Sequence, residues 1–282
     1  MPSTSGFVHN SGLRLRYVAW MPHGGAATDI PTVVLLHGLR AYAHWFDELA
    51  DAAGADFRLI ALDQRGRGGS GWSPEGVYNT DAYVADLEHL VDELGLQRFG
   101  LVGHSMGGTN SVNYAARHPD RVKALVIVDS APELDMRGVT RIREEMARTP
   151  ADFASREAAH AFLRSLHARA SAANFATRLE WMLKPEPDGR LSWRIDPAIF
   201  TRMTPDAPQR AWTALANIPC PTLIVRAAES DLVTPEVVSR MLTALPKGSA
   251  VEVADAGHMV LEDNPAGFNA AVIPFLKQAM AN

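Results

Sequence analysis

The stretch LVGHSMGGT, residues 101–109, joins an apolar run (residues 99–102) to a helix-like segment (residues 109–117). Its centre is Gly-x-Ser-x-Gly, the pattern of a serine held on a sharp turn between a strand and a helix. The strained backbone of such a turn leaves no room for a Cβ two residues before or after the serine. Gly103 and Gly107 meet that need, so Ser105 is the candidate nucleophile.

A serine on this turn lies at a helix N-terminus, where free N–H groups stabilise developing negative charge. An oxyanion hole needs two such donors aimed at one point. One is the backbone N–H of Met106. The other is expected from the loop after the apolar run 32–36, where Gly38 permits a close approach and Leu39 offers its N–H. The side chains of Met106 and Leu39 are expected only to form pocket walls.

A serine hydroxyl needs a base to act as a nucleophile, and His258 is the candidate among ten histidines. It follows Ala256-Gly257, directly after the last apolar run, and precedes the start of the final helix at Asn264-Pro265. A loop at the carboxyl end of a strand is where an open parallel sheet places its active groups.

The acid that orients this histidine is predicted to be Asp231, which lies just past the apolar run 222–225. This choice gives the chain order Ser, Asp, His that the motif requires. Two alternatives stay open. Asp129 ends the preceding apolar run and can reach the histidine from a neighbouring loop, whereas Glu229 beside Asp231 is better explained as a solvated side chain.

Substrate contacts are harder to predict from the sequence. Trp45, Trp181 and Trp193 are candidates to line a pocket, although aromatic side chains are more often simply packed. Arg40 is a less usual residue next to an oxyanion loop. It either meets a substrate carboxylate at the pocket rim or is a solvated surface arginine.

Composition narrows the function classes. The chain has 282 residues, of which 47% are hydrophobic and 21% charged, and its net charge of −5 offers no footprint for nucleic acid or an anionic membrane. No apolar stretch has membrane-spanning length, and the first ten residues carry neither a basic nor an apolar leader segment. A cytoplasmic location and a small-molecule substrate are expected, and the oligomeric state, monomer or homodimer, stays open.

Cofactor and metal motifs are weak or missing. Cys220 is the only cysteine, and no His-Glu-x-x-His pattern occurs, so no metal site is expected. Residues 66–71 match Gly-x-Gly-x-x-Gly after a strand, but loop residues 72–76 follow where a dinucleotide site needs a helix. We therefore reject that match and expect no cofactor.

Short apolar runs alternate with helical patterns, which predicts β-α-β units and a parallel sheet. After a hairpin of residues 6–9 and 13–20, the expected strands are residues 32–36, 57–62, 99–102, 124–128, 222–225 and 251–253. The expected helices between them are residues 45–53, 80–94, 109–117, 235–245 and 265–280.

The alternation of apolar runs with helical patterns stops after Asp129. Between residues 133 and 208 helix formers dominate, with a break at residues 184–189 and a short extended piece at residues 191–195. A helical segment inserted between two sheet strands is typical of a lid. The predicted organisation is a core of residues 1–132 and 209–282 and a helical cap of residues 133–208.

These features together resemble the α/β-hydrolase superfamily over nearly the whole chain. The matching residues are His37-Gly38, the loop 63–70, the turn from Gly103 to Gly108, Asp231 and Gly257-His258. The resemblance implies an α/β fold with a mostly parallel eight-stranded sheet flanked by helices, and the inserted segment as a cap over the pocket.

Within the superfamily the chain looks like the capped esterase, lactonase and carbon–carbon-bond hydrolase branch. Ser105 argues against epoxide hydrolases and haloalkane dehalogenases, which have aspartate at that position. The resemblance implies a serine hydrolase (EC 3.1) that cleaves a carboxylic ester or lactone through an acyl-enzyme, without a cofactor. Two alternatives stay open: cleavage of a β-diketone or vinylogous diketo acid by the same residues, or a small-molecule receptor with residual activity.

Overall fold

The computed structural model describes residues 1–22, 30–54, 56–202 and 206–281. Within them, eight strands form one sheet in the order β1-β2-β4-β3-β5-β6-β10-β11. The pairs β1–β2 and β2–β4 are antiparallel and the other neighbours are parallel. The bounds are β1 Ser3–Asn10, β2 Leu13–Trp20, β3 Thr32–Leu36, β4 Arg58–Leu62, β5 Phe99–His104, β6 Val122–Val128, β10 Thr222–Ala227 and β11 Gly248–Val253. The predicted fold class is confirmed.

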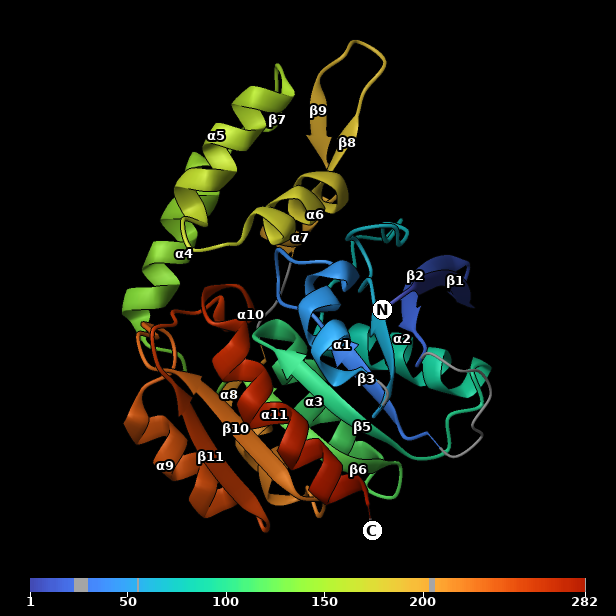
Figure 1. Ribbon diagram of the computed structural model, residues 1–282, viewed down its shortest axis with the longest axis vertical. Coiled ribbons are helices and arrows are strands. Elements are labelled where there is room, and N and C mark those ends of the chain that lie inside the picture. Colours follow the sequence, from blue (N-terminus) through green and yellow to red (C-terminus); the bar gives the residue numbers. More distant parts are fainter. Residues whose placement is uncertain (23–29, 55, 203–205, 282) are drawn as a thin grey trace.

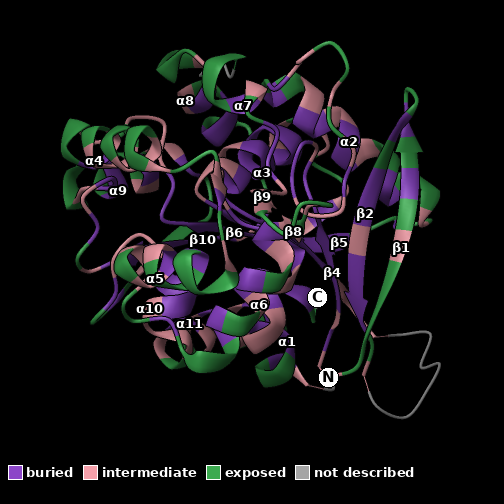
Figure 2. Ribbon diagram, turned by 90° about the horizontal axis from the view of Figure 1, so that it is seen from above, coloured by how far each residue is buried: buried purple, intermediate pink, exposed green. Residues whose placement is uncertain are grey.

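Helices cover both faces of this sheet, which Figure 2 shows from above. One face carries the short η1 (Ala43–Phe46), α1 (Asp47–Ala53) and α11 (Pro265–Met280), and α11 contacts β5, β6, β10 and β11. The other face carries α2 (Thr80–Glu93), α3 (Met106–Arg117), α8 (Pro208–Ala216) and α9 (Pro235–Ala244). Because helices cover both faces, every residue of β5 is buried, as its continuous apolar pattern predicts.

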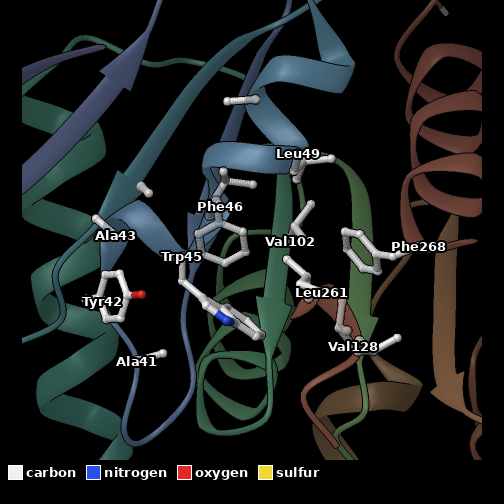
Figure 3. Close-up of a cluster of buried hydrophobic side chains, with 14 of the residues drawn as sticks. Ala41, Tyr42, Ala43, Trp45, Phe46, Leu49, Val102, Val128, Leu261 and Phe268 are labelled. Atoms are coloured by element: carbon white, nitrogen blue, oxygen red, sulfur yellow. The ribbon is translucent and has the colours of Figure 1, made fainter. Parts of the chain in front are cut away.

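The core on the η1 face is rich in aromatic side chains. Trp45 and Phe46 point from η1 toward Val102 and Leu261 (Figure 3), and all four are buried. The indole Nε1–H of Trp45 donates to Glu262 Oε1 at 2.9 Å, so its one polar atom is satisfied. This packing fixes the loop between β3 and α1, which lies next to the candidate nucleophile.

An insertion between β6 and α8 stands over the end of the sheet at which the parallel strands finish (Figure 1). It contains α4 (Met136–Arg148), β7 (Asp152–Phe153), α5 (Arg156–Leu166), α6 (Ala172–Met182), β8 (Leu183–Pro185), β9 (Leu191–Trp193) and α7 (Ala198–Arg202). It occupies the span predicted as the cap, whose residues 203–205 lie outside the described residues. We call it the cap below.

The cap is not wholly helical, which corrects the prediction. β7, β9 and β8 form a small antiparallel sheet. A tight turn makes this possible, because Gly189 adopts φ +83° and its N–H donates to the carbonyl of Glu186 at 3.0 Å. The break at residues 184–189 is therefore a hairpin turn, which pairs the extended piece after it with the residues before it.

None of the helices in the described ranges combines the length and the apolar character that crossing a bilayer requires.

Candidate active site

Ser105 sits on the sharp turn between β5 and α3, with φ +53° and ψ −121°. Glycine is required on both sides, for steric reasons that the structure makes explicit. A Cβ on Gly103 would lie 2.3 Å from the backbone oxygen of Gly107, and a Cβ on Gly107 would lie 2.2 Å from that of Leu36. Both contacts are with backbone, which cannot move aside. The Gly-x-Ser-x-Gly pattern is therefore a backbone requirement of this turn.

His258 reaches Ser105 from the loop between β11 and the short helix α10 (Val260–Asp263). Its Nε2 lies 3.0 Å from Ser105 Oγ, and its Nδ1 lies 2.8 Å from Asp129 Oδ2. Because a carboxylate only accepts hydrogen bonds, Nδ1 carries the proton and Nε2 accepts one from the serine hydroxyl. The imidazole is 12% exposed, so a substrate can reach it.

Asp129 is the acid that the structure places against His258. It follows β6 directly, adopts φ +41°, and its side chain is fully covered. Oδ2 also accepts from Ser230 Oγ at 2.8 Å, and Oδ1 accepts from the Ala227 N–H at 3.2 Å. Three donors from two segments, residues 227–230 and the loop of His258, therefore fix the carboxylate in one orientation.

The choice of Asp231 as the partner of His258 is wrong in this structure. Asp231 instead forms a two-pronged ion pair with Arg141 of α4, at 2.6 and 2.9 Å. The Arg141 hydrogen bonds hold the pKa of Asp231 below its ordinary value. Both acids satisfy the order Ser, Asp, His, so chain order did not separate them. Asp129 lies directly at the end of β6, the strand beside β5, and this adjacency is visible only in the sheet order.

The two predicted oxyanion donors lie on segments that flank the serine. Among the described residues, the backbone N–H groups of Leu39 and Met106 donate to no protein acceptor. The loop that carries Leu39 runs close to the nucleophile, since a Cβ on Gly38 would lie 3.2 Å from Ser105 Cβ. Two free N–H groups beside a serine oxygen fit the requirement for stabilising an oxyanion.

Buried polar side chains whose supporting role the sequence did not reveal hold this loop in place. His37 is fully buried, with Nδ1–H donating to the Gly38 carbonyl at 2.7 Å and Nε2 accepting from the Gln64 N–H at 3.0 Å. Arg67, also fully buried, donates from Nε to the Leu39 carbonyl at 2.9 Å. Arg67 belongs to the rejected glycine-rich match, so those residues form a support for the oxyanion loop.

His104 supports the base in a similar way. It is buried beside His258, with ring centroids 4.7 Å apart, and its Nε2–H donates to the His258 backbone carbonyl at 2.8 Å. Burial, followed by the charge of His258, lowers the pKa of His104 well below its ordinary value. A neutral His104 therefore positions the loop of His258 without adding a competing charge.

The buried neutral histidines predict a pH dependence of stability. Burial, the largest cause, lowers the pKa of His37 to about 4, and burial also lowers that of His104. A histidine in the unfolded chain titrates near about 6.5. Below that pH the unfolded chain binds more protons, so stability is fully present above about pH 6.5 and is lost toward pH 4. Each histidine contributes a loss of about 1.4 kcal/mol per pH unit.

Urea denaturation at pH 7.5 and at pH 5.0 measures this effect. We expect a lower free energy of unfolding at pH 5.0. An equal or higher value at pH 5.0 would contradict the assignment of neutral buried imidazoles.

Two of the four predicted pocket residues line a cavity, and the other two do not. Trp193 and Arg40 line a cavity of about 400 Å³ under the cap. Trp45 is instead part of the core, and Trp181 stacks on His44 with ring centroids 4.5 Å apart. Ser105 does not line this cavity, and Arg40 connects it to the loop of Leu39.

A family model described as alpha/beta hydrolase fold matches residues 31–265. The chain belongs to the α/β-hydrolase family. This α/β hydrolase is 31% identical to the 3-hydroxybutyrate-oligomer hydrolase of Cupriavidus necator, over 90% of this chain and 89% of that protein. It is also 31% identical to the sn-1-specific diacylglycerol lipase ABHD11 of Mus musculus, over 97% of this chain and 90% of that protein.

A solved structure of E-2-(acetamidomethylene)succinate hydrolase matches this α/β hydrolase with a TM-score of 0.85 and 27% identity. The match covers 97% of this chain and 99% of that chain. These relatives are hydrolases named for different substrates. The similarity therefore supports hydrolase activity for this chain but does not identify its substrate.

Proposed function

We propose that this chain is a serine hydrolase that cleaves a carboxylic ester or lactone of a small molecule through an acyl-enzyme on Ser105. The observation that carries the proposal is the chain of two hydrogen bonds from Ser105 Oγ through His258 to Asp129, 3.0 and 2.8 Å long. The backbone strain at Ser105 serves chemistry at its oxygen, because the turn presents the hydroxyl at the N-terminus of α3.

In the proposed reaction, His258 Nε2 takes the Ser105 proton while Oγ attacks the carbonyl carbon. Asp129 keeps the other imidazole nitrogen protonated and stabilises the imidazolium that forms. The N–H groups of Leu39 and Met106 hold the oxyanion, and each such donor typically lowers the barrier by about 3 kcal/mol.

Acylation ends when the alcohol leaves, and deacylation by water then regenerates the enzyme. His258 returns the proton to the leaving alcohol oxygen as the carbon–oxygen bond breaks, which leaves the acyl group on Ser105. Water then attacks the acyl carbon with His258 as base, and the proton passes to Ser105 Oγ as the acid departs. Each proton that His258 accepts is passed on in the next step, and the net reaction consumes one water molecule.

The relatives support a carboxylic ester. Two of them are named for an oligomer of a hydroxy acid and for a diacylglycerol, and both compounds contain carboxylic ester bonds. Their substrates are not transferred to this chain.

A substrate panel with active-site labelling tests the proposal. We expect a fluorophosphonate probe to label Ser105 and the enzyme to turn over short acyl esters or lactones, with a kcat of about 1 to 1,000 s⁻¹. Faster turnover of β-diketones or vinylogous diketo acids would replace the ester proposal by carbon–carbon cleavage. The absence of both labelling and multiple turnover would favour the receptor function.

A further inference from the structure

Arg40 is a cation at the junction of core and cap with no bonded acid. Among the described residues its guanidinium forms neither a hydrogen bond nor an ion pair. The guanidinium carbon lies over the Trp193 ring, 5.5 Å from the ring centroid. Burial, the largest cause, lowers the pKa of Arg40. A half-buried guanidinium with unused donors is stabilised by an anion that reaches it.

The acidic side chains near Arg40 are engaged elsewhere. Glu145 acts on Arg40 at longer range, but it accepts from Arg141 at 2.9 Å. Glu262 is bonded to Arg178, which is 1% exposed, and to Trp45. Among the described residues no carboxylate forms an ion pair with Arg40, although Glu262 Oε2 has no hydrogen-bond partner of its own.

The nearby charges act on Arg40 in both directions, the negative charge of Glu145 more strongly than the positive charge of Arg178. Arg178 acts on Arg40 as a like charge, and its buried Nε has no hydrogen-bond partner. His167 Nδ1 lies 3.5 Å from Glu262 Oε2. The pKa of His167 is nevertheless lowered to about 2, by burial and then by the charges of Arg178 and Arg40, so this imidazole is neutral at neutral pH.

Arg40 is also tied to the reaction centre by the chain itself. It follows Leu39 directly, and Gly38 packs against Ser105. On the other side it lines the cavity of about 400 Å³, together with apolar side chains such as Trp193 and with the charged Lys184 and Glu186. A substrate with its carbonyl at Ser105 can therefore extend one end past Leu39 toward Arg40.

We propose that Arg40 binds a carboxylate of the substrate, so that the preferred substrates are esters that carry a free carboxylate, such as monoesters of short dicarboxylic acids. This inference rests on the proposed function, because it places the ester carbonyl at Ser105. The guanidinium fork pairs with the carboxylate oxygens.

Matched substrates test the proposal. The monoethyl esters of succinate, glutarate and adipate are compared with the ethyl ester amides in which a neutral carboxamide replaces the carboxylate. We expect a higher kcat/KM for the anionic member at one or more chain lengths. In Arg40→Gln, the anionic-to-neutral ratio is expected to fall by about 10- to 100-fold, since a hydrogen bond to a charged group is lost. Arg40→Lys is expected to retain part of the preference.

Arg190→Gln is the matched control. It removes the same charge from the exposed β8–β9 turn of the cap, where Arg190 pairs with Asp152, and should leave the ratio unchanged. An unchanged ratio in Arg40→Gln, or the absence of any anionic preference in the unmodified enzyme at all three lengths, would overturn the inference.

Binding separates this inference from the proposed function. In the Ser105→Ala variant, calorimetric titration with the same monoesters should detect binding that Arg40→Gln weakens. Arg40-dependent binding without turnover of any ester by the unmodified enzyme would reject the proposed function and retain the carboxylate site. Turnover of neutral esters without any Arg40 effect on rate or binding would do the reverse.

Discussion

Replacing Ser105 by alanine is expected to lower kcat by about a millionfold while the protein stays folded. The loss removes the atom that forms the acyl-enzyme, so only background catalysis by the oxyanion donors and by binding remains. Stability should change little. Alanine keeps the Cβ at φ +53°, and only the hydrogen bond to His258 is lost, which contributes about 1 kcal/mol.

The measurement combines initial rates on the best ester of the panel with urea denaturation. Ser239→Ala, an exposed serine on α9, is the control and should retain full activity. Turnover by Ser105→Ala above about one per cent of the unmodified enzyme would reject Ser105 as the nucleophile, because background catalysis is far lower.

Asp129→Asn is expected to lower kcat by about ten-thousandfold. The Ala227 N–H still donates to the side-chain oxygen at the Oδ1 position, which turns the amide NH₂ toward His258. The imidazole must then accept at Nδ1 and carry its proton on Nε2, so it can no longer accept the Ser105 proton.

Asp231→Asn is the matched control, because it makes the same substitution at the other candidate acid. Asp231 is 31% exposed and pairs only with Arg141, an interaction that contributes at most about 1 kcal/mol. We expect kcat to fall by less than about tenfold. If Asp231→Asn proved as damaging as Asp129→Asn, or more so, the hydrogen-bond chain through Asp129 would not be the working one.

The sequence was sufficient wherever the requirement is local. Ser105 was predictable because the turn that exposes it excludes a Cβ at Gly103 and Gly107. This steric requirement involves only residues close together in the sequence. The sheet was predictable because strands covered on both faces are apolar over most of their length, as residues 99–102 of β5 and 124–128 of β6 are. The oxyanion loop was located because it follows the buried strand β3 directly, and His258 because it lies in the loop after β11, the last and mostly exposed strand.

Only the tertiary structure decided which acid serves the histidine. Asp129 and Asp231 both follow sheet strands and both precede His258, so chain order cannot distinguish them. The order of strands in the sheet places β6 next to β5, and α4 of the cap brings Arg141 onto Asp231. These two facts depend on which segments pack together.

The supports of the site were likewise hidden. Arg67 lay in the rejected glycine-rich match, and nothing in the sequence singled out Arg178, because burial and partners do not appear in a linear pattern. Burial changes the energetics of a charged side chain. Because desolvation is costly, the presence or absence of a hydrogen-bonded partner then has a large effect on stability. Residue order determined the nucleophile and the framework, and long-range packing determined the electrostatics around them.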